Sequence, residues 1–181
     1  MITGDPMRTP HLQAGLVGLV ATLALLAGCA GGQGPLMGSR EGGAASTICA
    51  LMRPSARVYY GAPMRNEGTR AITVDRVVVT DATNVADIDL GFDHDGYTIG
   101  TAAFPTGLGE LDIRPMLDSL RDTSGDVIAP GETVTLVLSP VPEVDGAEVV
   151  IREIIIHYRA NGWRYTETER ITFELAPDRC T

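Results

Sequence analysis

The stretch that decides the fold lies near the end of the chain: AEVVIREIIIHYRA (147–160), then Asn161-Gly162, then WRYTETERITFEL (163–175). Both flanking segments are rich in β-branched and aromatic residues, which are typical of strands. Asn and Gly both tolerate the positive φ angles that a two-residue type I′ turn requires. The sequence therefore predicts a β-hairpin. We expect its charged residues to face solvent and Tyr158, Trp163 and Tyr165 to fill an edge of the core.

Upstream of the hairpin, short segments of the same character alternate with turn signals. Further strands are predicted at 58–64, 71–80, 85–92, 97–104 and 132–139, separated by turns such as Asn66-Glu67-Gly68 and Pro130-Gly131. One helical turn is expected from Pro115, with its apolar side formed by Ile113, Met116, Leu117 and Leu120. About seven strands and hardly any helix predict an all-β fold, an antiparallel β-sandwich that resembles immunoglobulin-like domains in architecture.

The first 28 residues have the pattern of an export signal. The run 14–28, AGLVGLVATLALLAG, is uncharged but shorter than the about 20 apolar residues of a membrane-spanning helix. It leads into Leu26-Ala27-Gly28-Cys29, which resembles the lipobox of bacterial lipoproteins. The resemblance implies cleavage before Cys29 and a diacylglyceryl group on its thiol. The protein would then be held by lipid on the extracytoplasmic face of the cell membrane. A signal that is never cut, or an ordinary signal with a chance cysteine, is the alternative.

A Gly-rich segment follows the lipidation site. Residues 29–47, with AGGQGPLMGSREGGAAS at 30–46, predict a flexible tether that reaches roughly 20–25 Å, and the domain is expected at 48–181. Cys49 and Cys180 lie near the two ends of that domain. Two thiols exported from the cytoplasm usually oxidise, so a disulfide between them is predicted, with two free buried thiols as the alternative.

Charge and composition exclude several functions. The formal net charge is −9, which disfavours nucleic acid as a partner. The absence of Lys excludes mechanisms that need a lysine amine. No Gly-x-Ser-x-Gly motif is present, and beyond Cys29 the only imidazoles are His94 and His157. These observations favour a protein without catalytic residues.

One acidic segment could hold a cation. Asp87, Asp89, Asp93 and Asp95, with His94 among them, supply the oxygen ligands that Ca²⁺ prefers. The segment does not fit the EF-hand template, because the first and twelfth positions would be Gly91 and Ala102. The alternative is that the first two carboxylates lie on the solvent face of a strand and that the others form a turn.

A copper site is a further alternative. The chain loosely resembles exported copper chaperones of the cupredoxin-like kind in its all-β body, its Asn66-x-Gly68 turn and its Pro130-Gly131 turn. It departs from them because it has no His-x-Met pair to supply the soft ligands of Cu(I).

The leading hypothesis is a non-enzymatic, membrane-anchored β-sandwich that binds a protein or a component of the cell envelope, with no cofactor beyond its lipid. A metal-binding lipoprotein is the alternative, and a hydrolase comes third.

Overall fold

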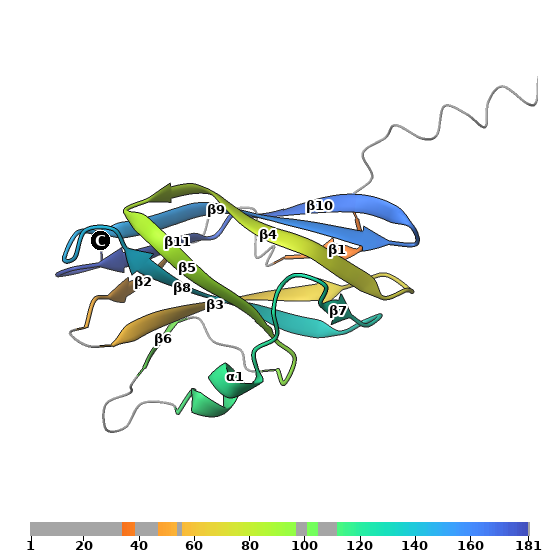
Figure 1. The fold of residues 1–181 in the computed structure, drawn as a ribbon, viewed down its shortest axis with the longest axis horizontal. Coiled ribbons are helices and arrows are strands. Elements are labelled where there is room, and N and C mark those ends of the chain that lie inside the picture. Colours follow the sequence, from red (N-terminus) through yellow and green to blue (C-terminus); the bar gives the residue numbers. More distant parts are fainter. Residues whose placement is uncertain (1–33, 39–46, 54–55, 97–100, 105–111, 181) are drawn as a thin grey trace, which may run out of the picture. The chain divides into compact units, whose positions relative to one another are not determined.

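Two β-sheets pack face to face in the structure, a computed structural model that describes residues 34–38, 47–53, 56–96, 101–104 and 112–180 (Figure 1). These residues belong to one compact unit, Gln33–Thr181, and form eleven strands and one short helix. The predicted signal peptide, lipobox and Cys29 lie outside the described residues. Within the described part of the chain, no helix is both long and apolar enough to span a bilayer.

The first sheet, sheet A, is antiparallel throughout. Its central strands are β3 (Arg57–Asn66) and β8 (Thr133–Pro142), and β5 (Val85–Asp93) pairs with the outer side of β8. Two short strands share the other side of β3. They are β1 (Leu36–Met37), near the end of β3, and β6 (Thr101–Phe104), near its start.

The second sheet, sheet B, is built around two long strands, β4 (Ile72–Thr83) and β9 (Val149–Ala160). The far side of β4 carries β7 (Val127–Ile128). Both β10 (Trp163–Glu169) and β11 (Thr172–Ala176) pair with the other side of β9. The strand β2 (Thr47–Leu51) runs parallel to β11 and is the one departure from the predicted antiparallel pattern among the described strands.

Period-two alternation builds the core between the sheets. In β9, for example, Ile154, Ile156 and Tyr158 are fully buried, whereas Ile155 and His157 between them are half-buried and Arg159 is exposed. Buried aliphatic and aromatic side chains of β3 and β8 face them across the interior. The all-β, immunoglobulin-like sandwich that the sequence predicts is therefore the observed fold.

The final hairpin is also confirmed. Trp163 pairs directly with Ala160, which leaves a two-residue loop, and both Asn161 (φ 52°) and Gly162 (φ 79°) have positive φ angles. The segment predicted as one strand, 163–175, is nevertheless divided into β10 and β11. Glu169 pairs with Ile154 and Phe173 with Ile151, so the returning chain has one residue more than β9 over this interval.

The predicted helical turn is present as α1 (Arg114–Ser119), with Pro115 in its first turn. Ile113 and Met116 are fully buried and pack with Tyr59 and Val137 on the outer face of sheet A. This small second cluster explains why a polar loop region carries apolar residues at helical spacing.

Three expectations are corrected. Residues 34–38 and Thr47 do not belong to a free tether, because Leu36 is fully buried and pairs with Asn66, and Thr47 begins β2. Glu167 and Glu169 are buried rather than solvent-facing. Trp163 does not fill the core edge, because 68% of the residue is exposed, whereas Tyr158 is buried as expected.

Candidate binding groove

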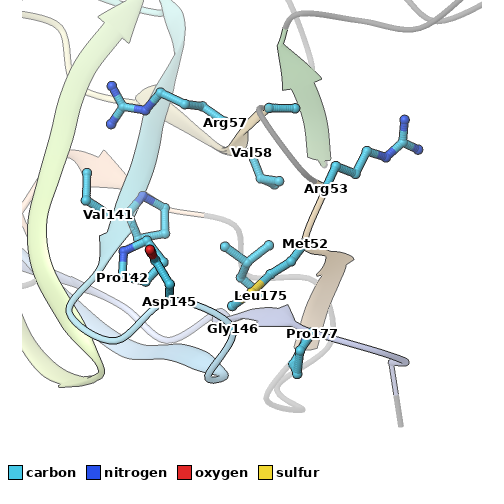
Figure 2. Close-up of a pocket in the computed structure, with 12 residues that line it drawn as sticks. Met52, Arg53, Arg57, Val58, Val141, Pro142, Asp145, Gly146, Leu175 and Pro177 are labelled. Atoms are coloured by element: carbon cyan, nitrogen blue, oxygen red, sulfur yellow. The ribbon is translucent and has the colours of Figure 1, made fainter.

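An open groove of about 560 Å³ lies at one end of the sandwich (Figure 2). It forms where β2 and β11 of sheet B meet the start of β3 and the end of β8 in sheet A. The residues that line it are Met52, Arg53, Ala56, Arg57, Val58, Pro140, Val141, Pro142, Asp145, Gly146, Leu175 and Pro177. We call this feature the end groove.

One wall of the end groove is the parallel pair β2–β11. The N–H of Met52 donates to the carbonyl of Ala176 at 2.8 Å and extends the pairing to the edge of the groove. The predicted disulfide is present beside this wall: Cys49 of β2 is bonded to Cys180, with their Cα atoms 5.8 Å apart. The cross-link therefore holds the last residues of the chain against β2.

The opposite wall is the loop between β8 and β9, and Asn84 fixes its shape. The Oδ1 atom of Asn84 accepts the N–H of Val144 at 2.7 Å. Its Nδ2 group donates to the carbonyls of Val144 (3.2 Å) and Ala147 (2.9 Å). Asn84 has a φ of 57°, a left-handed conformation in which Asn is enriched among non-glycine residues. Asn84, in the turn between β4 and β5, therefore holds the β8–β9 loop in place.

The groove is apolar at its centre, and charged side chains lie at its rim. Figure 2 shows Met52 and Leu175 side by side between the two walls, and the guanidinium groups of Arg53 and Arg57 point away from them. Arg57 forms an ion pair with Asp89. Val141, which lines the groove, is 36% exposed, and Val144 (60%) lies beside the lining residue Asp145 in the β8–β9 loop.

A buried ionic cluster occupies the other end of the sandwich. The Nε2 atom of His94 lies 2.6 Å from Oδ2 of Asp126, and its Nδ1 atom lies 2.8 Å from Oε1 of Glu132. The side chains of His94 and Asp126 are nearly inaccessible to solvent. Glu132 also accepts the N–H of Ala129 at 2.5 Å. The cluster ties the end of β5 to the segments that precede β7 and β8.

Two carboxylates raise the pKa of the His94 imidazole. Burial lowers the pKa of His94, but the hydrogen bonds to Glu132 and Asp126 raise it by more, and the net pKa is raised despite the nearby charge of Arg121. Burial acts to raise the pKa of Glu132, but the hydrogen bonds from His94 and Ala129 lower it overall. Since both ring nitrogens lie within hydrogen-bond distance of carboxylates, neither is free to act as the general base of a nucleophilic mechanism.

The four aspartates predicted as cation ligands are not brought together. Asp89 pairs with Arg57, and Asp87 accepts the N–H of Ile88 at 2.8 Å. Asp93 is fully buried and accepts the N–H of Asp95 at 3.2 Å. Within the described ranges, no three His, Cys, Asp or Glu side chains are arranged to hold a metal ion.

The two turns that resemble those of copper chaperones have a structural role. The Nδ2 group of Asn66 lies within hydrogen-bond distance of the carbonyls of Arg70 (2.9 Å), Ile128 (3.0 Å) and Ala129 (3.1 Å). The N–H of Gly131 donates to the carbonyl of Asn66 at 2.8 Å. Asn66 and the Pro130-Gly131 turn therefore bind each other.

Sequence reasoning missed the end groove because four separate segments contribute to it. Asn84 carried the one usable signal, since an Asn between two strand patterns suits a turn with positive φ.

No protein-family model matches the chain, and no curated protein matches it significantly. Solved structures that are similar to the chain include the following three. Domain 7 of the PapD-like domains of human CEP192 is 8% identical with a TM-score of 0.41, and the match covers 97% of this chain and all of that one. The CooA pilin subunit of enterotoxigenic Escherichia coli is 13% identical with a TM-score of 0.35, over 80% of this chain and 97% of the pilin. The Vibrio cholerae VesB protease is 13% identical with a TM-score of 0.38 over 77% of this chain, which spans about a third (32%) of the protease.

Proposed function

We propose that the protein is a lipid-anchored, extracytoplasmic binding protein whose β-sandwich holds a protein partner in the cell envelope through the end groove. No catalytic step is part of this proposal, and both ring nitrogens of His94 are already engaged by Asp126 and Glu132. The anchor is supported by the sequence Leu26-Ala27-Gly28-Cys29. The Cys49–Cys180 disulfide agrees with an oxidising location outside the cytoplasm.

The observation that carries the binding proposal is the distribution of exposed apolar side chains. The described residues expose five large hydrophobic side chains. One of them, Val141, lines the end groove, and Val144 lies in the β8–β9 loop next to the lining residue Asp145. Single exposed hydrophobics are normal on a protein surface, but a contiguous apolar patch marks an interaction site. The buried floor formed by Val58 and Leu175 adds a place for an inserted side chain.

The groove suits a protein better than a small molecule. Small-molecule sites enclose most of the surface of their ligand, whereas this groove is only partly enclosed. Its prolines and valines present apolar surface, and the guanidinium groups beside it point outward. We therefore expect the partner to insert aliphatic or aromatic side chains between the β2–β11 wall and the β8–β9 loop.

The test is site-specific photo-crosslinking in intact envelopes from a probe at position 144, compared with a probe at Val127. Val127 is matched to Val144 because it is also exposed (49%) and aliphatic but belongs to β7, outside the groove. A discrete adduct is expected from position 144 alone, and the substitution Val141→Glu, at an exposed residue that lines the groove, should remove it. An identical set of adducts from both positions, or an adduct that survives Val141→Glu, would exclude the groove as the binding site.

A further inference from the structure

The end of the sandwich opposite the groove has features of a surface that rests on lipid. The tip of the β9–β10 hairpin is at this end, and it presents Trp163, the single Trp of the sequence, with 68% of the residue exposed. Trp is favoured at membrane–water interfaces, where an apolar ring with one polar N–H suits the headgroup region. The exposure of Trp163 is otherwise unexplained by the packing of the domain.

The segment that leads to the lipidation site reaches the domain beside this tip. A Cβ atom on Gly34 would lie 1.8 Å from the hydroxyl of Tyr158 and 2.9 Å from Cδ1 of Tyr165, so Gly34 lies directly over this tyrosine pair. Tyr165 is two residues from Trp163 on the same face of β10. Pro35 is held as well, because its carbonyl accepts the N–H of Glu67 at 2.8 Å.

This attachment point limits how far the domain can move from the membrane. Only five residue steps separate Gly34 from Cys29, and a fully extended chain of that length spans at most about 18 Å. The strand β9 has twelve residues and runs from the groove end to the hairpin end, a distance of about 40 Å. A lipid on Cys29 therefore keeps the hairpin end, and not the groove end, close to the bilayer.

Charged side chains of both signs are exposed at each end, with Glu67 and Asp95 at the hairpin end and Arg53 and Arg57 at the groove end. Arg65, Arg70 and Arg164 are exposed near the ends of β3, β4 and β10, and none of them forms an ion pair among the described residues. The loop of the groove end exposes three carboxylates, those of Glu143, Asp145 and Glu148. Arginine side chains favour contact with anionic lipid headgroups, and carboxylates disfavour it.

From these observations we infer that the hairpin tip around Trp163 contacts the lipid surface and that the end groove is presented away from it. The inference rests on the lipid anchor of the proposed function and adds an orientation to it. The partner is then bound on the aqueous side, at the far end of the domain from the membrane.

The single Trp makes this orientation measurable. Full-length mature protein is reconstituted into phosphatidylethanolamine–phosphatidylglycerol vesicles, with and without lipids brominated close to the headgroup, which quench nearby Trp emission. The matched control is the double variant Trp163→Phe, Val144→Trp, which moves the only Trp to the groove end. Should that variant fail to fold, Leu51→Trp in the Trp163→Phe background places the probe at the same end.

Brominated lipid is expected to quench Trp163 several-fold more than the Trp introduced at the groove end. Flotation of the vesicles and fatty-acid labelling report the anchor separately. Protein that floats with the vesicles but shows no quenching, or equal quenching at both ends, overturns the orientation alone. Protein that is neither labelled nor floated overturns the anchor and the orientation together.

Discussion

The backbone N–H of Leu36 donates a hydrogen bond of 3.2 Å to the hydroxyl of Tyr158, and this bond joins β1 of sheet A to β9 of sheet B. Burial raises the pKa of Tyr158 to about 12, so the hydroxyl stays protonated over the physiological range. The ring of Tyr165 stacks on that of Tyr158, with centroids 5.5 Å apart. The two tyrosines therefore fix the segment through which the chain enters the domain.

Removing this hydroxyl should loosen the segment. We expect Tyr158→Phe to lower the free energy of unfolding by about 1–3 kcal/mol, because a buried N–H loses its acceptor. Urea unfolding measures the loss, and faster hydrogen exchange at the amide of Leu36 locates it. The control is Tyr165→Phe, which keeps the stacked ring and should cost no more than about 0.5 kcal/mol. Equal losses in the two variants would contradict the role given to the Tyr158 hydroxyl.

The His94 cluster predicts how stability depends on pH. Because the pKa of His94 is raised by folding, its contribution is fully present below the unfolded value of about 6.5 and is lost as pH rises through the higher folded value. The pKa of Glu132 is lowered, so its contribution is lost as pH falls below its ordinary value of 4.5. The free energy of unfolding should therefore fall as pH rises above about 6.5. Urea unfolding measured between pH 4.5 and 6.5, and again at alkaline pH, tests this.

The variant His94→Gln should flatten that alkaline decline. His157→Gln is the matched control, because His157 lies on the outer face of β9 and its ring has only a 3.4 Å contact with Thr166. A decline that persists in His94→Gln, or that disappears in His157→Gln, would assign the dependence to another group.

The hairpin turn offers a test of backbone strain alone. Gly162 has a φ of 79°, and no heavy atom lies within 4 Å of the position that a Cβ would take. Gly162→Val should therefore lower the free energy of unfolding by about 1–3 kcal/mol through strain rather than collision. The control is Arg164→Gln, at an exposed residue close to the turn, which should change the free energy of unfolding by less than about 0.5 kcal/mol. If urea melts give the same stability for both, the turn does not have this conformation.

This hairpin shows what sequence patterns report well. Asn161-Gly162 selects its turn through local backbone chemistry, and the alternating residues on either side place the strands. The same alternation could not show that Glu167 and Glu169 face inward, because their burial depends on what covers β10. Leu36 was missed for a related reason, since a Gly-rich context predicts a coil and two residues of strand show no periodicity.

The disulfide should contribute strongly to stability. It links residues 131 positions apart, and the chain-entropy model assigns a closed loop of this size about 5 kcal/mol as an upper figure. Reductant should lower the free energy of unfolding of the natural protein. It should not change the free energy of unfolding of the Cys49→Ser variant, which cannot form the disulfide. When mature protein is denatured without reductant, an alkylating agent should modify neither Cys49 nor Cys180. Modification of both thiols would contradict the cross-link.

The sites differ from the fold in how far the sequence can predict them. Cys49 and Cys180 could be paired because only two cysteines follow Cys29. The His94 cluster unites residues 94, 126 and 132, and the end groove unites four segments, so both depend on tertiary packing. The acidic segment illustrates the converse, because Asp87 and Asp93 are close in sequence while their carboxylates accept separate backbone N–H groups, those of Ile88 and Asp95.

The central claim is that Cys29 carries the lipid that holds this domain outside the cytoplasm. Metabolic labelling with a clickable fatty acid tests it most directly, in cells that produce the natural protein or the Cys29→Ala variant. We predict a labelled mature protein in the membrane fraction for the natural sequence, and an unlabelled, uncleaved precursor for Cys29→Ala. Label on the Cys29→Ala variant, or none on the natural protein, would contradict the account.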